Sequence, residues 1–180
     1  MTTKSIAVFC GSRPGTNPVY LEAARLLGQE IAKKNITLIY GGGNAGLMGE
    51  VANAVLNSNG KVIGVMPKNL VEREVAHKHL TQLHVVNTMH ERKNLMAQLS
   101  TGFVAMPGGF GTMDEICEMI TWVQLNIHKK SCGFFNVNGF FDHFLKFIEH
   151  TVAEDFVSKE TQGKLILEQN ASRLIEKILI

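Results

Sequence analysis

The stretch Ala105-Met-Pro-Gly-Gly-Phe-Gly-Thr-Met-Asp-Glu115 joins an apolar strand to a glycine turn and then to a helix that carries an acid in its first turns. The same order of apolar run, turn and helical periodicity recurs along the chain. Strands are predicted at residues 6–10, 37–40, 61–66, 80–87, 102–106, 132–137 and 165–167, and helices at about 18–34, 47–58, 89–100, 111–126, 140–156 and from 172. This alternation predicts an α/β fold, a doubly wound parallel sheet with helices on both faces.

The length and composition favour one globular domain that spans residues 1–180. The chain of 180 residues can bury a substantial single core, and its hydrophobic content of 45% and charged content of 19% are ordinary for a globular protein. The net charge of +2 is too small to indicate a nucleic-acid surface, so we expect no nucleic-acid partner and a small molecule as the ligand. Residues 68–78 hold many charges and few apolar anchors, which predicts a functional loop or a short helix.

The cysteines and histidines show no pattern typical of a metal site or of a disulfide framework. Cys10, Cys117 and Cys132 form an odd set without CxxC spacing, as expected of reduced core residues. Four of the seven histidines, at positions 77, 79, 84 and 90, fall in one region but lack a helical HxxxH pair or cysteine partners, so we expect no metal. Without a signal segment or an apolar run of about 20 residues, we also expect no membrane contact and a cytoplasmic location.

A doubly wound sheet binds its ligands outside the carboxyl ends of its strands. Four predicted loops lie at that edge, at residues 11–13, 41–46, 87–92 and 107–115. The second loop, Gly41-Gly-Gly-Asn-Ala-Gly46, formally satisfies GxGxxG, but a dinucleotide site also needs an acid after the next strand, where this chain has Val65-Met-Pro67. We interpret Gly42, Gly43 and Asn44 as residues that let the backbone approach a nucleotide, and a tight structural turn is the alternative.

Successive glycines at the start of a helix make residues 107–112 a candidate anion site. Backbone N–H groups at a helix start bind phosphate, and the Thr112 hydroxyl is either a cap or a further donor. No P-loop lysine follows, which disfavours nucleotide triphosphate hydrolysis. Glu115 lies three residues after Thr112 on the same side of the helix, where the positive helix end favours its ionised form. The alternative for Glu115 is an ordinary surface carboxylate, as expected for Asp114.

Arg92 is predicted to place a cation on an otherwise apolar helix face. That face is formed, at helical spacing, by Met89, Leu95, Met96 and Leu99. An unpaired buried guanidinium is unfavourable, so it should meet a carboxylate, a phosphate or a ligand, and a structural ion pair in the core is the alternative. Because helices 89–100 and 111–126 both begin at the carboxyl edge of the sheet, we expect Arg92 and Glu115 to converge. On the second of these helices a core stripe is expected at Met113, Ile116, Cys117, Ile120 and Ile127.

Met89-His-Glu-Arg-Lys93 followed by Pro107-Gly-Gly-Phe-Gly-Thr-Met-Asp-Glu115 resembles the MHxRK and PGGxGTxxE motifs of the LONELY GUY (LOG) family. The resemblance covers nearly the whole chain and includes Cys10-Gly-Ser12, residues 41–49, Gly64-Val-Met-Pro67 and Thr121-Trp122. It implies a Rossmann-like fold, a homodimer, and hydrolysis of the N-glycosidic bond of a nucleoside 5′-monophosphate to free base and ribose 5-phosphate. We expect no cofactor: the family was long labelled lysine decarboxylase, but no lysine here has the context of a pyridoxal-phosphate site.

The resemblance also assigns roles to residues of this chain. It implies Arg92 and Glu115 as the catalytic pair. It implies a phosphate loop at Gly108, Gly109, Gly111 and Thr112. The nucleotide pocket is predicted to include Gly11, Ser12, Arg13, Gly42, Gly43, Asn44, Met89 and Lys93. Arg73 and Glu74 also resemble the family, but their role stays open, as does the choice between adenine and an N6-modified adenine. A non-catalytic nucleotide or molybdenum-cofactor carrier is the alternative function, because related folds share the glycine loops.

Overall fold

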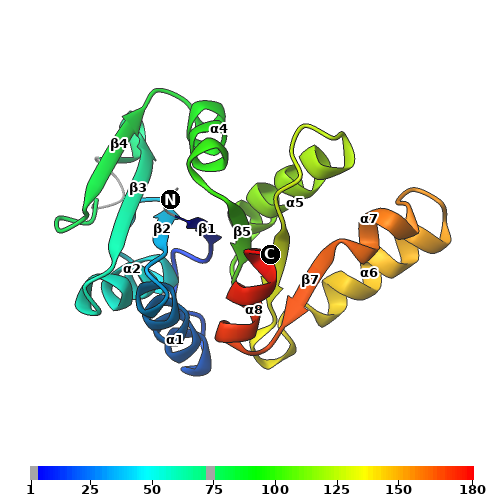
Figure 1. Ribbon diagram of the computed structural model, residues 1–180, viewed down its shortest axis with the longest axis horizontal. Coiled ribbons are helices and arrows are strands. Elements are labelled where there is room, and N and C mark those ends of the chain that lie inside the picture. Colours follow the sequence, from blue (N-terminus) through cyan, green and yellow to red (C-terminus); the bar gives the residue numbers. More distant parts are fainter. Residues whose placement is uncertain (1–3, 72–75) are drawn as a thin grey trace.

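The computed structural model describes residues 4–71 and 76–180 and contains a seven-stranded sheet in which neighbouring strands are parallel (Figure 1). Its strands are β1 (Ser5–Phe9), β2 (Thr37–Tyr40), β3 (Lys61–Pro67), β4 (Gln82–Val86), β5 (Gly102–Ala105), β6 (Cys132–Phe135) and β7 (Leu165–Glu168). The central strands β1 and β5 are buried along their whole length because helices cover both of their faces. The predicted α/β doubly wound class is confirmed.

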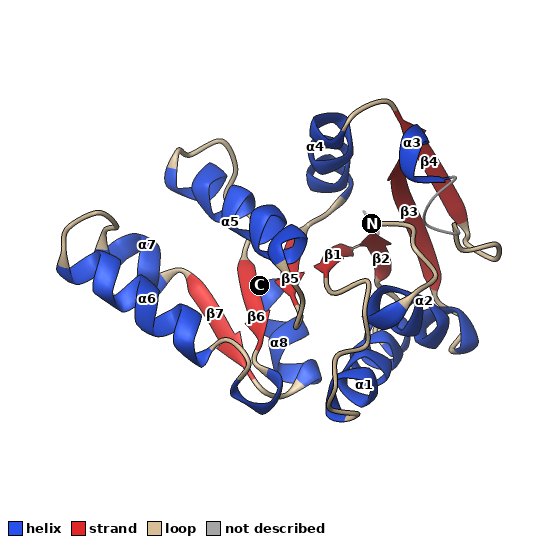
Figure 2. Ribbon diagram, turned by 180° about the vertical axis from the view of Figure 1, so that it is seen from behind, coloured by secondary structure: helices blue, strands red, loops and turns tan. Residues whose placement is uncertain are grey.

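Two layers of helices enclose the sheet (Figures 1 and 2). The helices are α1 (Val19–Lys33), α2 (Gly46–Asn57), α3 (Lys68–Val71), α4 (Met89–Leu99), α5 (Phe110–Gln124), α6 (Asp142–Ala153), α7 (Lys159–Gly163) and α8 (Ala171–Ile178), with a 3₁₀ turn η1 (Val137–Gly139). One core joins the sheet to α1, α2 and α8. The other joins it to α4, α5 and α6. Each layer thus delivers helix N-termini to the carboxyl edge of the sheet.

The order of the strands creates a crevice beside β1. Strand order across the sheet is β4-β3-β2-β1-β5-β6-β7, so the chain moves outward from β1 to β4 and then returns to the opposite side of β1 as β5. The loops that follow β1 and β5 therefore lead to helices on opposite faces of the sheet, which is the usual place for a ligand in such folds. The two loops stay in contact, since the Gly11 N–H donates to the Pro107 carbonyl at 3.0 Å.

Several elements differ from their predicted ranges. The predicted helix at 140–156 is shorter, and a separate helix, α7, follows it. The strand predicted to reach residue 137 ends at Phe135, because the backbone leaves the extended conformation at Asn136, with φ of −79° and ψ of 61°, and enters the 3₁₀ turn η1. The short-helix interpretation of residues 68–78 is confirmed for α3, whereas Arg73 and Glu74 lie outside the described residues.

Two further observations concern the surface. Ile127 was expected in the core stripe, but this expectation is wrong, because the residue is 61% exposed. Helix α5 ends at Gln124, so Ile127 lies beyond the helix and does not continue its buried face. In the ranges 4–71 and 76–180, no helix is long and apolar enough to cross a membrane.

Candidate active site

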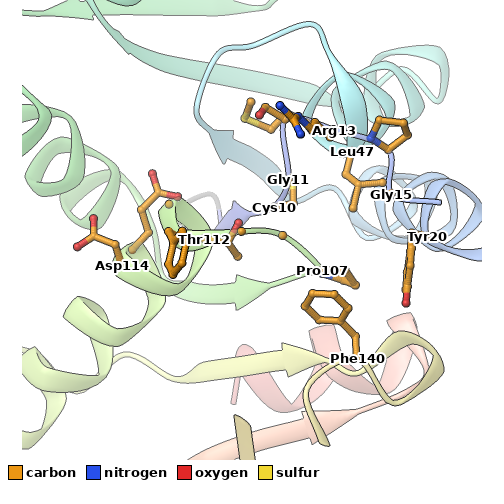
Figure 3. Close-up of a pocket in the computed structure, with 18 of the residues that line it drawn as sticks. Cys10, Gly11, Arg13, Gly15, Tyr20, Leu47, Pro107, Thr112, Asp114 and Phe140 are labelled. Carbon is orange, nitrogen blue, oxygen red and sulfur yellow. The ribbon is translucent and has the colours of Figure 1, made fainter. Parts of the chain in front are cut away.

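A cavity of about 530 Å³ opens at the carboxyl edge of the sheet, in the crevice between the loops after β1 and β5 (Figure 3). Its wall combines segments from both layers of helices. These segments are residues 10–15 after β1, Tyr20 on α1, Leu47 and Met48 on α2, Met89 and Arg92 on α4, residues 107–112, Asp114 and Glu115 at the start of α5, and Phe140 after η1. The volume is in the range of small-molecule sites.

The first turn of α5 forms one side of the cavity. Gly109 is the N-cap residue, without a side-chain hydrogen bond to the helix, so the first N–H groups of α5 are available to an anion. A Cβ atom added to Gly109 or Gly111 would meet nothing within 4 Å, which leaves this side of the cavity open to a ligand. Thr112 was expected to be either a cap or a further donor; it lies in the first turn and not at the cap, and it is only 3% exposed.

Gly108 differs from Gly109 and Gly111, because its lack of a side chain allows close packing against Thr112 and Gly11 and does not open space for a ligand. A Cβ atom on Gly108 would collide with the Thr112 hydroxyl and would come within 2.9 Å of the Gly11 backbone nitrogen. Only a residue without a side chain lets the β1 loop, the glycine turn and Thr112 approach this closely. The two kinds of glycine therefore act differently: Gly108 allows close packing, while Gly109 and Gly111 leave room in the cavity.

Arg92 and Glu115 converge at the cavity wall, as predicted. The Arg92 Nη2 lies 3.4 Å from the Glu115 Oε1, and the two residues are only 9% and 7% exposed. The Arg92 Nε also donates to the Val65 carbonyl oxygen at 3.1 Å, which fixes the guanidinium at the end of β3. A Cβ atom on Gly41 would collide with this guanidinium, so the first glycine of the loop after β2 makes room for Arg92.

The protonation of Glu115 is governed mainly by burial. Burial raises the pKa of Glu115, the Arg92 guanidinium opposes this rise, and the Asp114 carboxylate adds to it. We expected the helix end to favour the ionised form, and this expectation is wrong in its net direction. Glu115 lies in the second turn of α5, where the field of the helix end has weakened, and desolvation outweighs what remains.

Lys93 supports α5 from outside the cavity wall. Its Nζ lies 3.2 Å from the Asp114 Oδ2 and 3.0 Å from the Glu118 Oε2. Burial acts to lower the pKa of Lys93, but the hydrogen bonds to Glu118 and Asp114 outweigh it and raise the pKa. Lys93 therefore compensates the two acids that flank Glu115 on α5.

Among the described residues, the predicted pocket is only partly assembled. The cavity wall includes Gly11, Ser12, Arg13 and Met89 together with the whole predicted phosphate loop. Gly42, Gly43, Asn44 and Lys93 lie outside that wall. The loop after β2 instead lies outside the wall and supports it, because Gly41 leaves room for the Arg92 guanidinium. The His77 N–H also donates a hydrogen bond to the Gly42 carbonyl of this loop at 3.1 Å. This geometry fits the alternative of a structural turn.

An aromatic pair in the cavity wall, Tyr20 and Phe140, was not predicted from the sequence. Tyr20 and Phe140 pack edge to face, with ring centroids 5.8 Å apart, and Figure 3 shows both rings beside Pro107. Phe140 is positioned by the buried Asn136, which accepts the Phe141 N–H at 2.8 Å and donates to Asp142 at 2.7 Å. The position of Phe140 in the site could have been predicted, because this residue follows the carboxyl end of the strand predicted at residues 132–137.

The spacing of the histidines, cysteines and acidic residues decides whether the part of the chain that the structure describes can hold a metal ion. Within residues 4–71 and 76–180, no group of three or more His, Cys, Asp or Glu side chains is arranged to hold a metal ion. Cys10 lines the cavity, but burial and the nearby Glu115 raise the pKa of its thiol and keep it protonated. The cavity wall thus combines the buried ion pair, the open first turn of α5 and the exposed Arg13.

Comparison with known proteins places this site in a family. Residues 48–178 match the family model described as possible lysine decarboxylase. The chain is 45% identical over 175 residues, 97% of its length and 72% of the relative's, to the cytokinin riboside 5′-monophosphate phosphoribohydrolase LOG of Oryza sativa subsp. japonica. It is 44% identical over 167 residues, 92% of its length and 84% of the relative's, to the cytokinin riboside 5′-monophosphate phosphoribohydrolase of Rhodococcoides fascians.

A solved structure of the molybdenum cofactor carrier protein from Chlamydomonas reinhardtii has the same fold, with a TM-score of 0.75 and 22% identity over 98% of each chain. That likeness shows the fold alone. The identities to the phosphoribohydrolases, which are 43–45% over most of the chain, confirm the family resemblance noted in the sequence. The chain therefore belongs to the LOG family, whose family model carries the description possible lysine decarboxylase.

Proposed function

We propose that this protein is a nucleoside 5′-monophosphate phosphoribohydrolase, an N-glycosyl hydrolase that releases a free base and ribose 5-phosphate from AMP or a cytokinin riboside 5′-monophosphate. The observation that carries this proposal is the buried Arg92–Glu115 pair, which shares one cavity wall with an open helix N-terminus. The names of the relatives support it. No cofactor or metal is needed for this chemistry.

The phosphate of the substrate binds at the first turn of α5. Free N–H groups of the turn, with the positive end of the helix, stabilise a dianion without a metal. Arg13 is exposed, lines the same cavity and adds a cation to it. With the phosphate seated there, the sugar lies over the following turn of α5, where Glu115 is.

Glu115 acts on the reacting carbon of the sugar. As the C1′–N bond breaks, positive charge develops on the sugar ring, and an ionised carboxylate beneath C1′ stabilises it. Glu115 orients a water molecule whose oxygen bonds to C1′ as the C1′–N bond breaks, and it takes up one of the two water protons. The other proton stays on the new C1′ hydroxyl, and the proton held by Glu115 passes through solvent to the nitrogen of the departing base. The raised pKa of Glu115 makes it a better proton acceptor than an ordinary glutamate.

Arg92 keeps Glu115 ionised and in place. Its guanidinium is held by the Val65 carbonyl on one side and faces the carboxylate on the other, so it opposes the effect of burial on Glu115. The same group is close enough to the cavity to bind a sugar hydroxyl or the phosphate. Fixing carboxylate and sugar in one geometry accounts for part of the rate enhancement.

Incubation of the purified protein with AMP tests this function. We expect adenine and ribose 5-phosphate in equal amounts, and we expect Glu115→Gln and Arg92→Ala each to lower turnover by about 100-fold or more, the usual scale for removal of one transition-state contact. Glu22→Gln, the same kind of substitution at an exposed position of α1, should leave turnover unchanged.

Three other outcomes contradict this assignment. AMP binding without any release of adenine indicates the nucleotide-carrier alternative. Near-wild-type hydrolysis in either variant removes the catalytic pair from the mechanism. Loss of the fold in Arg92→Ala indicates that the pair is a structural ion pair of the core.

We also propose that the enzyme works as a homodimer in the cytoplasm. Phe110 is 97% exposed and Met89 is 41% exposed, although both line the cavity, so two large apolar side chains stand at its wall without a covering layer. The free thiols of Cys10, Cys117 and Cys132 suit a reducing compartment.

A further inference from the structure

A second cavity, of about 330 Å³, lies at the opposite edge of the sheet from the candidate active site. It is bounded by the last turns of α5, the loop that follows, the first residues of β6 and β7, and α7. Helix α5 has 15 residues, so it spans about 22 Å between the two cavities. A ligand in this second cavity is therefore separate from the nucleotide.

The floor of the second cavity is apolar. Ile120 and Val123 contribute from α5, and Leu165 contributes from the start of β7. All three are only partly buried and pack against the core on the α5 side of the sheet. Such a floor favours a ligand with an apolar body, since the apolar surface is removed from water on both sides.

The rim of the second cavity is basic. Lys129, Lys130 and Lys164 line it, and no acidic side chain does so in the described ranges. Lys130 is partly buried, and its Nζ donates to the Ala97 carbonyl oxygen at 2.6 Å. Burial lowers the pKa of Lys130. Lys164 pairs with Glu160 at 2.7 Å, but that glutamate side chain is 79% exposed, so the pair is weak. The rim thus has an excess of positive charge next to apolar surface.

His128 lies in the wall of this cavity beside Lys130. Its Nδ1 accepts the Lys130 N–H at 3.2 Å, and burial together with Lys130 lowers the pKa of the ring, which is neutral at pH 7. The single proton of the ring is therefore on Nε2. That atom is buried and has no hydrogen-bond partner among the described residues. The ring also packs against Trp122, with centroids 6.2 Å apart.

We propose that this second cavity binds a small organic anion, with an apolar body of about one ring over Ile120, Val123 and Leu165 and a single carboxylate held by Lys130 and Lys164. The volume suits a molecule of this size. A carboxylate satisfies the partly buried Lys130, whose Nζ has one hydrogen-bond partner among the described residues, the neutral Ala97 carbonyl. This binding function is independent of nucleotide hydrolysis.

Fluorescence of the single tryptophan tests it directly. Trp122 contacts His128 in the cavity wall, so a bound molecule changes its emission. The probe is 3-phenylpropionate, and its uncharged analogue 3-phenylpropan-1-ol has the same apolar body. We expect saturable binding of the acid, at least 10-fold tighter than that of the alcohol, as is typical of a hydrogen bond to a charged group. Saturating AMP should leave the titration unchanged.

Variants separate the cavity from the rest of the surface. Lys130→Met and Lys164→Met should each weaken binding of the acid by about 10-fold without changing binding of the alcohol, while Lys33→Met, at an exposed position of α1, should have no effect. Lys164 is half exposed, so its variant is expected to fold even where Lys130→Met does not. Equal affinity for acid and alcohol, displacement of the acid by AMP, or unchanged binding in Lys164→Met would each overturn the proposed site.

Discussion

Opposing effects act on one carboxylate at the residue scale. Desolvation raises the pKa of Glu115, and the guanidinium of Arg92, 3.4 Å away, lowers it. Burial alone would raise the pKa further, and Arg92 limits that rise. The combination gives a carboxylate with a raised affinity for a proton, which is what a general base needs.

The first prediction concerns the pH dependence of AMP hydrolysis. Activity needs ionised Glu115, so kcat/KM should fall as the pH decreases through the raised pKa of this group, above the ordinary range of a glutamate. In Arg92→Ala the effect that lowers the pKa is removed, and the acid limb of the residual activity should move to higher pH. Both proteins are measured with the same substrate, so titration of the AMP phosphate affects both profiles equally. An unchanged or lower acid limb in Arg92→Ala would contradict the coupling.

The second prediction separates the glycines of the turn. Gly111→Ala adds a methyl group that meets no protein atom within 4 Å, at a helical position where alanine is favoured over glycine by up to about 1 kcal/mol. The variant should be as stable as the wild type or more stable, but its KM for AMP should rise by about 10-fold as the methyl group enters the cavity.

Gly108→Ala is the matched variant. Its methyl group collides with Thr112 and the backbone of Gly11, so this variant should lose about 1 to 3 kcal/mol of stability. Thermal unfolding and steady-state kinetics on both proteins measure the two effects. Loss of stability in Gly111→Ala with an unchanged KM would show that this glycine is structural.

The sequence predicted the position of a site residue correctly where burial of its charge requires a partner, as for Arg92, and not where it rested on a motif alone, as for Lys93. A guanidinium on an apolar helix face must find a partner, and the strand order brings it to Glu115. Lys93, one residue further along α4, was assigned to the pocket from the same motif, yet it points to Asp114 and Glu118 instead. Neighbouring helical residues differ by about 100° in direction, so one motif can serve both the cavity and the support behind it.

At the element scale, α1 and α2 pack closely because of one small residue. Gly28 on α1 is buried, and a Cβ atom there would come within 2.6 Å of the Val51 carbonyl oxygen and the Ala54 Cβ on α2. Helix α2 carries Leu47 into the cavity wall, and α1 follows the loop that contains Gly11. Their separation therefore affects the width of the site.

The third prediction concerns this contact. Gly28→Ala gains helix propensity of about 1 kcal/mol but overpacks a rigid backbone contact by about 1 to 3 kcal/mol, so we expect a net loss of about 1 kcal/mol in the free energy of unfolding. Gly163→Ala on α7, where an added Cβ atom meets nothing within 4 Å, should be neutral or stabilising. Urea denaturation of the two variants measures the difference. Equal stabilities would mean that α2 moves freely.

Strands were predictable where both faces are buried, and less so elsewhere. The apolar runs of β1, β2 and β5 have no other explanation in an α/β protein. By contrast, α7 is a single short helix with one buried residue, Thr161, and its Ser158 cap follows a Phe-rich segment that hides the break. Helices of this length depend on tertiary contacts more than on their own pattern, so they leave little trace in a sequence.

At the scale of the whole molecule, the strand order determines where the site forms. Reversal of direction at β1 places α1 and α5 on opposite faces of the sheet and opens the cavity between their N-termini (Figures 1 and 2). Tyr20 and Phe140 pack against each other in the wall of the cavity. Phe110 and Met89 also line the cavity and are exposed to solvent, and we propose that a second copy of the chain covers them.

The last prediction tests that assembly. We expect light scattering to give twice the chain mass of 19.9 kDa, with specific activity falling on dilution wherever the mass falls. Burial of one Phe110 side chain contributes about 2 kcal/mol, so its loss from both copies in Phe110→Ser should weaken dimerisation by about 1000-fold. Phe156→Ser, at an 81% exposed position away from the cavity, should remain dimeric. A particle with the mass of one chain and constant specific activity at every concentration would show that the cavity needs no second copy.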